Sequence, residues 1–217
     1  MIKKGELIQN QHDHRPSKAV TLSNIVSPYL KVQDIAEDRK DQPTRVIDMV
    51  KDSLLTQSAI VDTLTDDIVK CVVVDRYRHQ LIHFVGYVRH SGLTKGAIAA
   101  SIAHDAHNLI VLGANDADIV MAINRIIAIQ GGIVIVNNQT ILDELPLPIT
   151  GLMSDRPLDE VVKTTQRLQD IAQNTLGFEH SIVALTFLAL PVIPYLKMNP
   201  RGYIDVLTQT LITKSST

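Results

Sequence analysis

Cysteine is nearly absent from this 217-residue sequence, which contains one, Cys71. A lone thiol excludes a disulfide within the chain. It also excludes zinc sites built from several thiolates, including the H-x-E and P-C-x-x-C pattern of zinc deaminases. Cys71 lies inside the apolar run of residues 69–74. We therefore expect a buried strand residue at this position and not a nucleophile.

Tryptophan is absent and aromatic residues make up only 4% of the sequence, so the chain offers few rings on which bases could stack. Basic residues are not in excess either, since 21 Lys and Arg residues face 23 Asp and Glu residues. Both shortages argue against a nucleic-acid partner. The small net charge of -2 and the 45% of hydrophobic residues exclude disorder as the main state.

Long apolar runs are missing as well. The longest candidate, residues 181–196, is shorter than the roughly 20 residues that cross a bilayer, and it contains two prolines. The charged start of the chain is followed by no apolar signal core. We therefore expect a cytoplasmic protein with no membrane partner. The sequence also has no phosphate-binding glycine loop, no nucleophile elbow and no H-E-x-x-H motif.

The sequence divides into two parts. Residues 1–43 are polar and irregular, and they predict an N-terminal arm that is either mobile or wrapped around the rest. From residue 44 the apolar pattern tightens. Residues 44–217 predict one domain, in keeping with the usual domain size of about 150 residues.

Strand and helix patterns alternate in the second part. Apolar runs rich in Val, Ile and Ala predict strands over residues 45–51, 68–75, 84–88, 97–103, 109–112 and 181–190, and a hairpin over residues 133–145. Apolar stripes at helical spacing predict one helix between Asn115 and Gly131 and another between Pro157 and Gly177. This alternation predicts an α/β or α+β layered domain whose helices pack on one face of a mixed β-sheet.

Polar residues capable of chemistry lie near the end of the strand predicted over residues 97–103 and in its connection to the strand predicted over residues 109–112. They are Ser101 in the strand and His104, Asp105, His107 and Asn108 in the connection. Imidazoles exchange protons near neutral pH, a carboxylate can fix their tautomer, and an amide suits the edge of a polar heterocycle. His104 and His107 are also candidate metal ligands. The alternative is a hydrogen-bonded turn that only joins the two strands.

Residues 151–155 are a second candidate site, because they precede a predicted helix N-terminus, where free N–H groups favour anions or polar ligand atoms. Ser154 and Asp155 are the candidate ligand-binding side chains, with plain helix capping as the alternative. Five of the other histidines are expected in solvent, at the surface or in a hairpin, although two of them have the H-x-H spacing of a metal pair. The five are His12, His14, His79, His83 and His90.

Several stretches resemble the C-terminal domain of bacterial adenine deaminase, the amidohydrolase-type enzyme that converts adenine to hypoxanthine and ammonia. They keep the order and spacing of that family over about residues 44–206. The stretches are KGAIA at 95–99, SIAHDAHN at 101–108, GAND at 113–116, AINR at 122–125, GG at 131–132, LPLPI at 145–149, GLMSD at 151–155 and LALPVIP at 188–194.

The resemblance implies a hydrolase of purine metabolism. It also implies a divalent metal, Mn or Fe, which the full enzyme holds in a β/α barrel that precedes this domain. Such a barrel needs roughly 250 residues, and the 43 residues before the match cannot form one. We therefore expect no amidohydrolase barrel in this chain. The chain would be a split or truncated part of a purine deaminase, with an amidohydrolase barrel subunit and a purine base as its partners. The alternative is a non-catalytic purine- or metal-binding module that forms a homo-oligomer.

Overall fold

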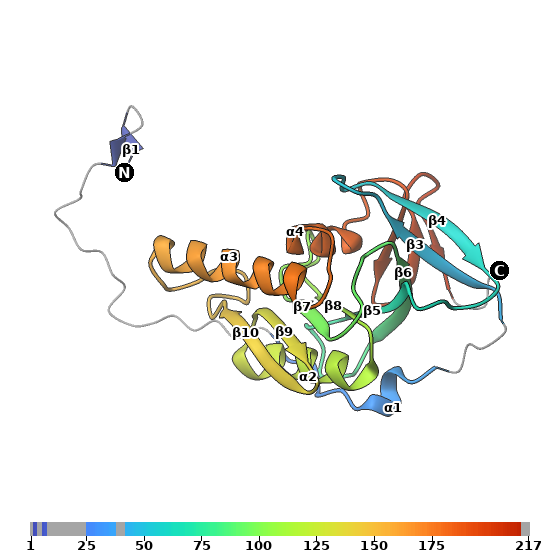
Figure 1. Ribbon diagram of the computed structural model, residues 1–217, viewed down its shortest axis with the longest axis horizontal. Helices are drawn as coiled ribbons and strands as arrows, with labels where there is room; N and C mark the ends of the chain where they lie inside the picture. The colour runs from blue at the N-terminus through green and yellow to red at the C-terminus, as the bar shows by residue number, and fades with distance from the viewer. Residues whose placement is uncertain (1, 4–5, 8–24, 38–41, 214–217) are drawn as a thin grey trace.

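The computed structural model describes residues 2–3, 6–7, 25–37 and 42–213 (Figure 1). Its centre is an eight-stranded sheet with the order β10-β9-β7-β8-β5-β6-β3-β4. Neighbouring strands are antiparallel except for the parallel pair β3 and β6. The strands are β3 (Thr44–Met49), β4 (Thr56–Val61), β5 (Ile68–Val74), β6 (His83–Arg89), β7 (Ala97–Ala100), β8 (Leu109–Gly113), β9 (Gly132–Asn137) and β10 (Thr140–Pro146). The mixed α/β layering is confirmed, and the sheet does not close into a barrel within the described residues.

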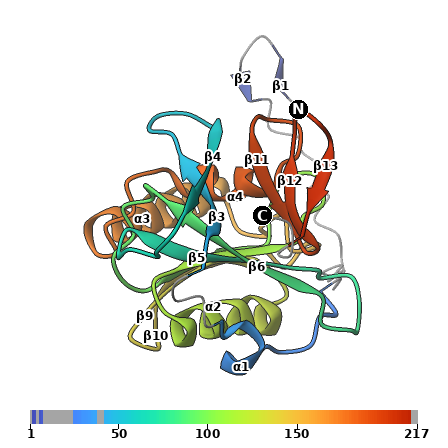
Figure 2. The same cartoon turned by 90° about the vertical axis from the view of Figure 1, so that its right-hand side faces the viewer.

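Helices cover both faces of this sheet, so the prediction that they pack on one face was wrong. The helix α2 (Asp116–Ile129) packs with Ala97 and Ala99 of β7, and α3 (Leu158–Asn174) packs with the opposite layer through Leu168 and Ala172. Figure 2 shows α2 below the sheet and α3 above it. The reason is that the central strands are apolar on both sides, and each side needs a cover. None of the helices in the described part of the chain is long and apolar enough to cross a membrane.

The prediction of a strand over residues 181–190 was wrong. This segment forms the short helix α4 (Ile182–Thr186) and the 3-10 turn η1 (Phe187–Ala189). Ser181 starts α4, because its hydroxyl accepts a hydrogen bond from the backbone N–H of Ala184. A short apolar run has no period that separates a buried strand from a buried helix, so the cap residue was the informative signal.

Several short elements were not predicted from the sequence. The strands β11 (Leu196–Asn199), β12 (Gly202–Asp205) and β13 (Thr210–Ile212) form a separate three-stranded sheet that contacts β4 and β6. The edge strand β4 was missed because its side chains are mostly exposed. The remaining elements are β1 (Ile2–Lys3), β2 (Glu6–Leu7) and α1 (Val32–Ile35).

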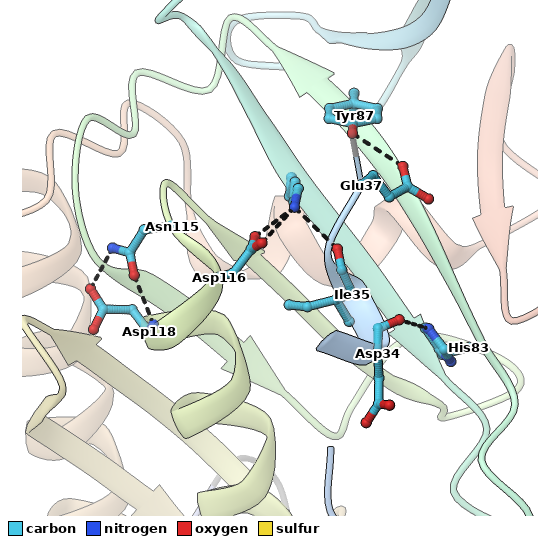
Figure 3. A network of polar contacts seen from close by, with 9 residues as sticks. Asp34, Ile35, Glu37, His83, Tyr87, Asn115, Asp116 and Asp118 are labelled. Carbon is cyan, nitrogen blue, oxygen red and sulfur yellow. Dashed lines mark hydrogen bonds and ion pairs between the residues drawn. The ribbon is translucent and has the colours of Figure 1, made fainter. Parts of the chain in front are cut away.

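Part of the predicted N-terminal arm packs against the domain. Ile35 in α1 is fully buried in the core layer of α2. The amino group of Lys70 on β5 donates hydrogen bonds to the carboxylate of Asp116 at 2.6 and 2.8 Å and to the Ile35 carbonyl at 3.1 Å (Figure 3). Asn124 of α2 bonds both backbone groups of Leu30. Residues 25–37 are thus held to the sheet and to α2 together.

Cys71 is fully buried in the middle of β5, as expected. Burial raises the pKa of the Cys71 thiol, so the nucleophilic thiolate is disfavoured. This confirms the interpretation of the single cysteine as a core residue.

Candidate functional site

The polar connection between β7 and β8, residues 101–108, is here called the 101–108 bend. Ser101 at its start is fully buried. Its hydroxyl donates to the Gly151 carbonyl at 2.6 Å and accepts from the Gly132 N–H at 2.8 Å. Ser101 therefore joins the end of β7 to the start of β9 and to the turn of residues 149–153. A ligand contact by Ser101 stays a prediction.

His104 is oriented by α4. Its Nδ1 lies 3.0 Å from the hydroxyl of Thr186, and that hydroxyl donates its only proton to the Val183 carbonyl at 2.7 Å. The Thr186 oxygen must then accept, which makes Nδ1 of His104 a protonated ring nitrogen. The imidazole packs on Phe187, with ring centroids 3.9 Å apart. Its Nε2 has no hydrogen-bond partner among the described residues.

His107 has a backbone φ of 48°, in the left-handed region that few non-glycine residues adopt. Its Nδ1 is buried without a hydrogen-bond partner among the described residues. Burial lowers the pKa of His107, and the charge of Arg76 and then His104 lower it further, against an opposing effect of Asp105. The ring is therefore neutral at physiological pH. Asp105 itself is exposed and also has a positive φ, of 65°.

Asn108 ends the bend at the first position before β8. The side chain is 9% exposed, and its Oδ1 is buried with no partner among the described residues. An amide oxygen in this state lacks the hydrogen bond that water would give it, which is costly for the fold. A water, a ligand or a second protein surface could supply the missing hydrogen bond.

Arg76 is the residue of this site that sequence reasoning missed. Its side chain is 1% exposed, yet it forms no ion pair with a carboxylate of the described residues. Its two terminal nitrogens donate to the Ser101 carbonyl at 3.4 Å and to the Thr150 carbonyl at 2.7 Å, and its Nε has no partner in the described part of the chain. In the sequence it is one of two arginines in a polar loop, and nothing there marks it as buried.

Arg76 also explains why a glycine stands in the turn of residues 149–153. A Cβ at Gly151 would come within 2.7 Å of Nη1 of Arg76, and Gly151 has a φ of 72°. Any side chain would therefore push the guanidinium away and strain the turn. The turn, Arg76 and the 101–108 bend form one packed unit.

The second candidate segment lies beside this unit but is less closely tied to it. The hydroxyl of Ser154 accepts a hydrogen bond from the backbone N–H of Arg156 at 3.1 Å, and Asp155 is exposed. Neither side chain caps α3, whose N-cap is Pro157 without a side-chain hydrogen bond. The role of Ser154 and Asp155 in ligand binding stays a prediction.

Among the described histidines outside the bend, none forms a side-chain hydrogen bond with it. Nε2 of His83 is 2.8 Å from the Asp34 carbonyl, and His79 and His90 are exposed. His12 and His14 lie outside the described residues.

The donor set does not fit a resident divalent ion by itself. Within residues 25–37 and 42–213, no three His, Cys, Asp or Glu side chains come together in a group that could hold a metal. Nδ1 of His104 is occupied by Thr186. A metal on His104 and His107 would need ligands from outside these residues, and it stays a prediction.

Chemically, the unit offers two imidazoles, an amide oxygen and a buried guanidinium. Such groups can bind a polar heterocycle and hold or move a proton at Nε2 of His104. They do not include a nucleophile that could replace an activated water, since Cys71 is buried and Ser101 is fully engaged.

Comparison with known proteins places this arrangement in a family. The family described as "Adenine deaminase C-terminal domain" matches residues 47–210, which include the 101–108 bend and the turn of residues 149–153. An adenine deaminase of Thermosipho melanesiensis is 40% identical over 202 residues, covering 87% of this chain and 34% of that protein. An adenine deaminase of Brucella abortus is 36% identical over 204 residues, covering 88% of this chain and 35% of that protein.

A third relative, an adenine deaminase of Methylobacterium nodulans, is 47% identical over 145 residues, covering 66% of this chain and 25% of that protein. The chain therefore spans about a third or less of the length of the curated relatives that it matches. The match covers most of the chain, and the chain belongs to the adenine deaminase C-terminal domain family.

Proposed function

We propose that this chain supplies the C-terminal part of a purine deaminase of the adenine deaminase type, which converts adenine and water to hypoxanthine and ammonia. The observation that carries the proposal is the 101–108 bend. It lies inside the family match and holds buried polar atoms of His107 and Asn108 that have no partner in the described residues. Groups of this kind are stable when a ligand or a second protein surface satisfies them.

Each group has a distinct part in this proposal. His104, fixed by Thr186 and Phe187, presents Nε2 as a proton acceptor toward the substrate. Asn108 accepts a hydrogen bond from the purine, and neutral His107 donates or accepts one. The divalent ion, Mn or Fe, and the water that it activates would belong to the amidohydrolase barrel, because the described residues do not form a set of metal ligands.

Complementation tests this proposal. The purified chain is mixed with a relative of Thermosipho melanesiensis type from which the C-terminal domain has been removed, together with adenine and Mn²⁺. We expect ammonia release only when both are present, and its loss when the chain carries His104→Ala. The matched control is His79→Ala, since His79 is exposed and its side chain forms no hydrogen bond with the bend. No ammonia from a mixture of two folded proteins that bind each other would refute the proposal.

The same unpartnered atoms favour a second function if the bend can bind a ligand without a barrel subunit. The chain would then be an accessory module that binds a purine or a divalent metal without hydrolysis. Calorimetric titration with adenine, hypoxanthine, Mn²⁺ and Zn²⁺ tests this, again with the His104→Ala and His79→Ala variants. The accessory-module proposal would be contradicted if the titrations release or absorb no heat, or if the His104→Ala variant gives the same heat as the parent chain.

A further inference from the structure

A cavity of about 440 Å³ lies where β3 and the edge strand β4 meet the three-stranded sheet β11-β12-β13. Its volume falls in the range of small-molecule pockets. Arg45 and Gln57 line it from the large sheet, and Tyr195, Asp205 and Leu207 line it from the C-terminal region. It shares no lining residue with the 101–108 bend.

The walls of this cavity are fixed to each other by buried hydrogen bonds. The hydroxyl of Thr56 on β4 donates to the Leu196 carbonyl of β11 at 2.7 Å. The hydroxyl of Tyr203 on β12 donates to the Arg45 carbonyl of β3 at 2.8 Å. Two backbone hydrogen bonds also join Thr56 to the 194–195 segment. The cavity is therefore preformed, which lowers the entropic cost of filling it.

Two opposite charges line the cavity without neutralising each other. Arg45 and Asp205 form no ion pair. The guanidinium of Arg45 donates one hydrogen bond, to the hydroxyl of Ser58 at 3.2 Å, and its Nε is buried without a partner in the described residues. Asp205 uses Oδ1 to accept from the N–H groups of Leu207 and Thr208, which leaves Oδ2 open.

The other lining groups complete a mixed environment. The carboxamide of Gln57 and the hydroxyl of Tyr195 form no hydrogen bond within the described residues, and both side chains are exposed. Leu207 and Ile212 add aliphatic surface to the same cavity. A guanidinium, a carboxylate and an aliphatic wall around one space fit a ligand that carries both charges and an apolar group.

We propose that this cavity binds an α-amino acid with an aliphatic side chain. The ligand carboxylate pairs with Arg45, where the planar guanidinium can form two parallel hydrogen bonds. The ligand ammonium pairs with Oδ2 of Asp205, and the aliphatic side chain packs on Leu207 and Ile212. This binding function is separate from deamination, and it does not depend on the function proposed for the bend.

Calorimetry on the full chain tests the proposal with L-leucine as the probe. We expect one binding site for L-leucine, and binding weaker by about tenfold or more for each analogue that lacks one charge, 4-methylpentanoate or 3-methylbutylamine. Arg45→Gln and Asp205→Asn should each weaken L-leucine binding by about tenfold or more. Arg201→Gln is the control, because Arg201 is exposed and does not line the cavity.

Thermal unfolding of each variant separates loss of binding from loss of fold. Asp205→Asn keeps an oxygen for the N–H groups of Leu207 and Thr208, so this variant remains decisive if Arg45→Gln does not fold. The proposal is overturned if the folded chain shows no binding to L-leucine at millimolar concentration. It is equally overturned if 4-methylpentanoate and 3-methylbutylamine bind as well as L-leucine, or if Asp205→Asn binds L-leucine with unchanged affinity.

Discussion

At the scale of single residues, the chain buries two cations without a carboxylate partner among the described residues. Arg76 is 1% exposed and donates to the carbonyls of Ser101 and Thr150, which are 25 and 74 residues away in the chain. Lys197 is fully buried on β11, and its amine donates to the Leu54 carbonyl. Because these partners are distant in the sequence, no local pattern predicts either burial, whereas the polar bend could be predicted from the interruption of two apolar runs.

Replacement of Arg76 should change both stability and the titration of His107. Arg76→Gln removes the donor to Thr150, and we expect a loss of about 1–3 kcal/mol of unfolding free energy. It also removes the positive charge that lowers the pKa of His107, so this pKa should rise, while burial still keeps it below the ordinary value. NMR titration of the imidazole measures the pKa. Arg78→Gln, at an exposed neighbour, should change neither quantity.

Lys197 should make stability depend on alkaline pH. Burial lowers the pKa of Lys197 from 10.5 to about 8 in the folded chain. Below pH 8 the amine is charged in both states, and the cost of burying the charge is present in full. Between pH 8 and 10.5 the unfolded chain binds a proton that the folded chain has lost, so this group makes the fold more stable as pH rises.

The variant Lys197→Met isolates this effect. It removes the buried charge, so we expect it to match or exceed the parent in unfolding free energy at pH 7. The advantage should shrink steadily as pH rises from 8 to 10, in urea denaturation followed by circular dichroism. Lys51→Met at an exposed position is the control. A constant difference between Lys197→Met and the parent across this range would contradict the pKa assigned to Lys197.

At the scale of elements, long periodic segments were predicted and short ones were not. The stripe of Ile119, Ile123 and Ile126 predicted the helix α2, and the β-branched run of residues 68–74 predicted the strand β5. The faces on which the helices pack could not be predicted, because strands that are apolar on both sides accept a helix on either side. The segment of α4 was too short for a period, and its tertiary role was also hidden, since Thr186 orients a histidine that is 82 residues away.

Loss of the α4 cap should therefore reach the bend. Ser181→Ala removes the hydroxyl that accepts from the N–H of Ala184, and we expect a cost of about 1 kcal/mol. Fraying of this short helix should loosen Thr186, so that the ring nitrogens of His104 no longer show a single protonated Nδ1 by ¹⁵N NMR. Thr63→Ala, in an exposed loop, is the control. Destabilisation without any change in the His104 tautomer would show that α4 does not set the ring.

At the scale of the whole molecule, the described part of the chain leaves large apolar side chains exposed on α4, at the start of α3 and after η1. Val183 on α4 is 52% exposed, Leu158 at the start of α3 is 75% exposed, and Val192 after η1 is 65% exposed. Thr186, which holds His104, lies one turn from Val183 on the same helix. Apolar groups beside a functional site often mark the surface where a partner binds. This favours a barrel subunit that covers α4 and the bend together, with a second copy of the chain as the alternative occupant.

A charge at Val183 should disrupt such an interface without harming the fold. We expect Val183→Asp to weaken binding to the barrel portion of a relative by about tenfold or more, and to abolish ammonia release in the complementation assay. Ile60→Asp is the matched control, because Ile60 is 54% exposed but lies on the edge strand β4. Light scattering on the chain alone distinguishes the occupants. If two copies cover α4, the parent chain will be a dimer that Val183→Asp converts to a monomer. If both variants bind the barrel portion, release ammonia and show the same oligomeric state as the parent chain, then α4 is not part of an interface.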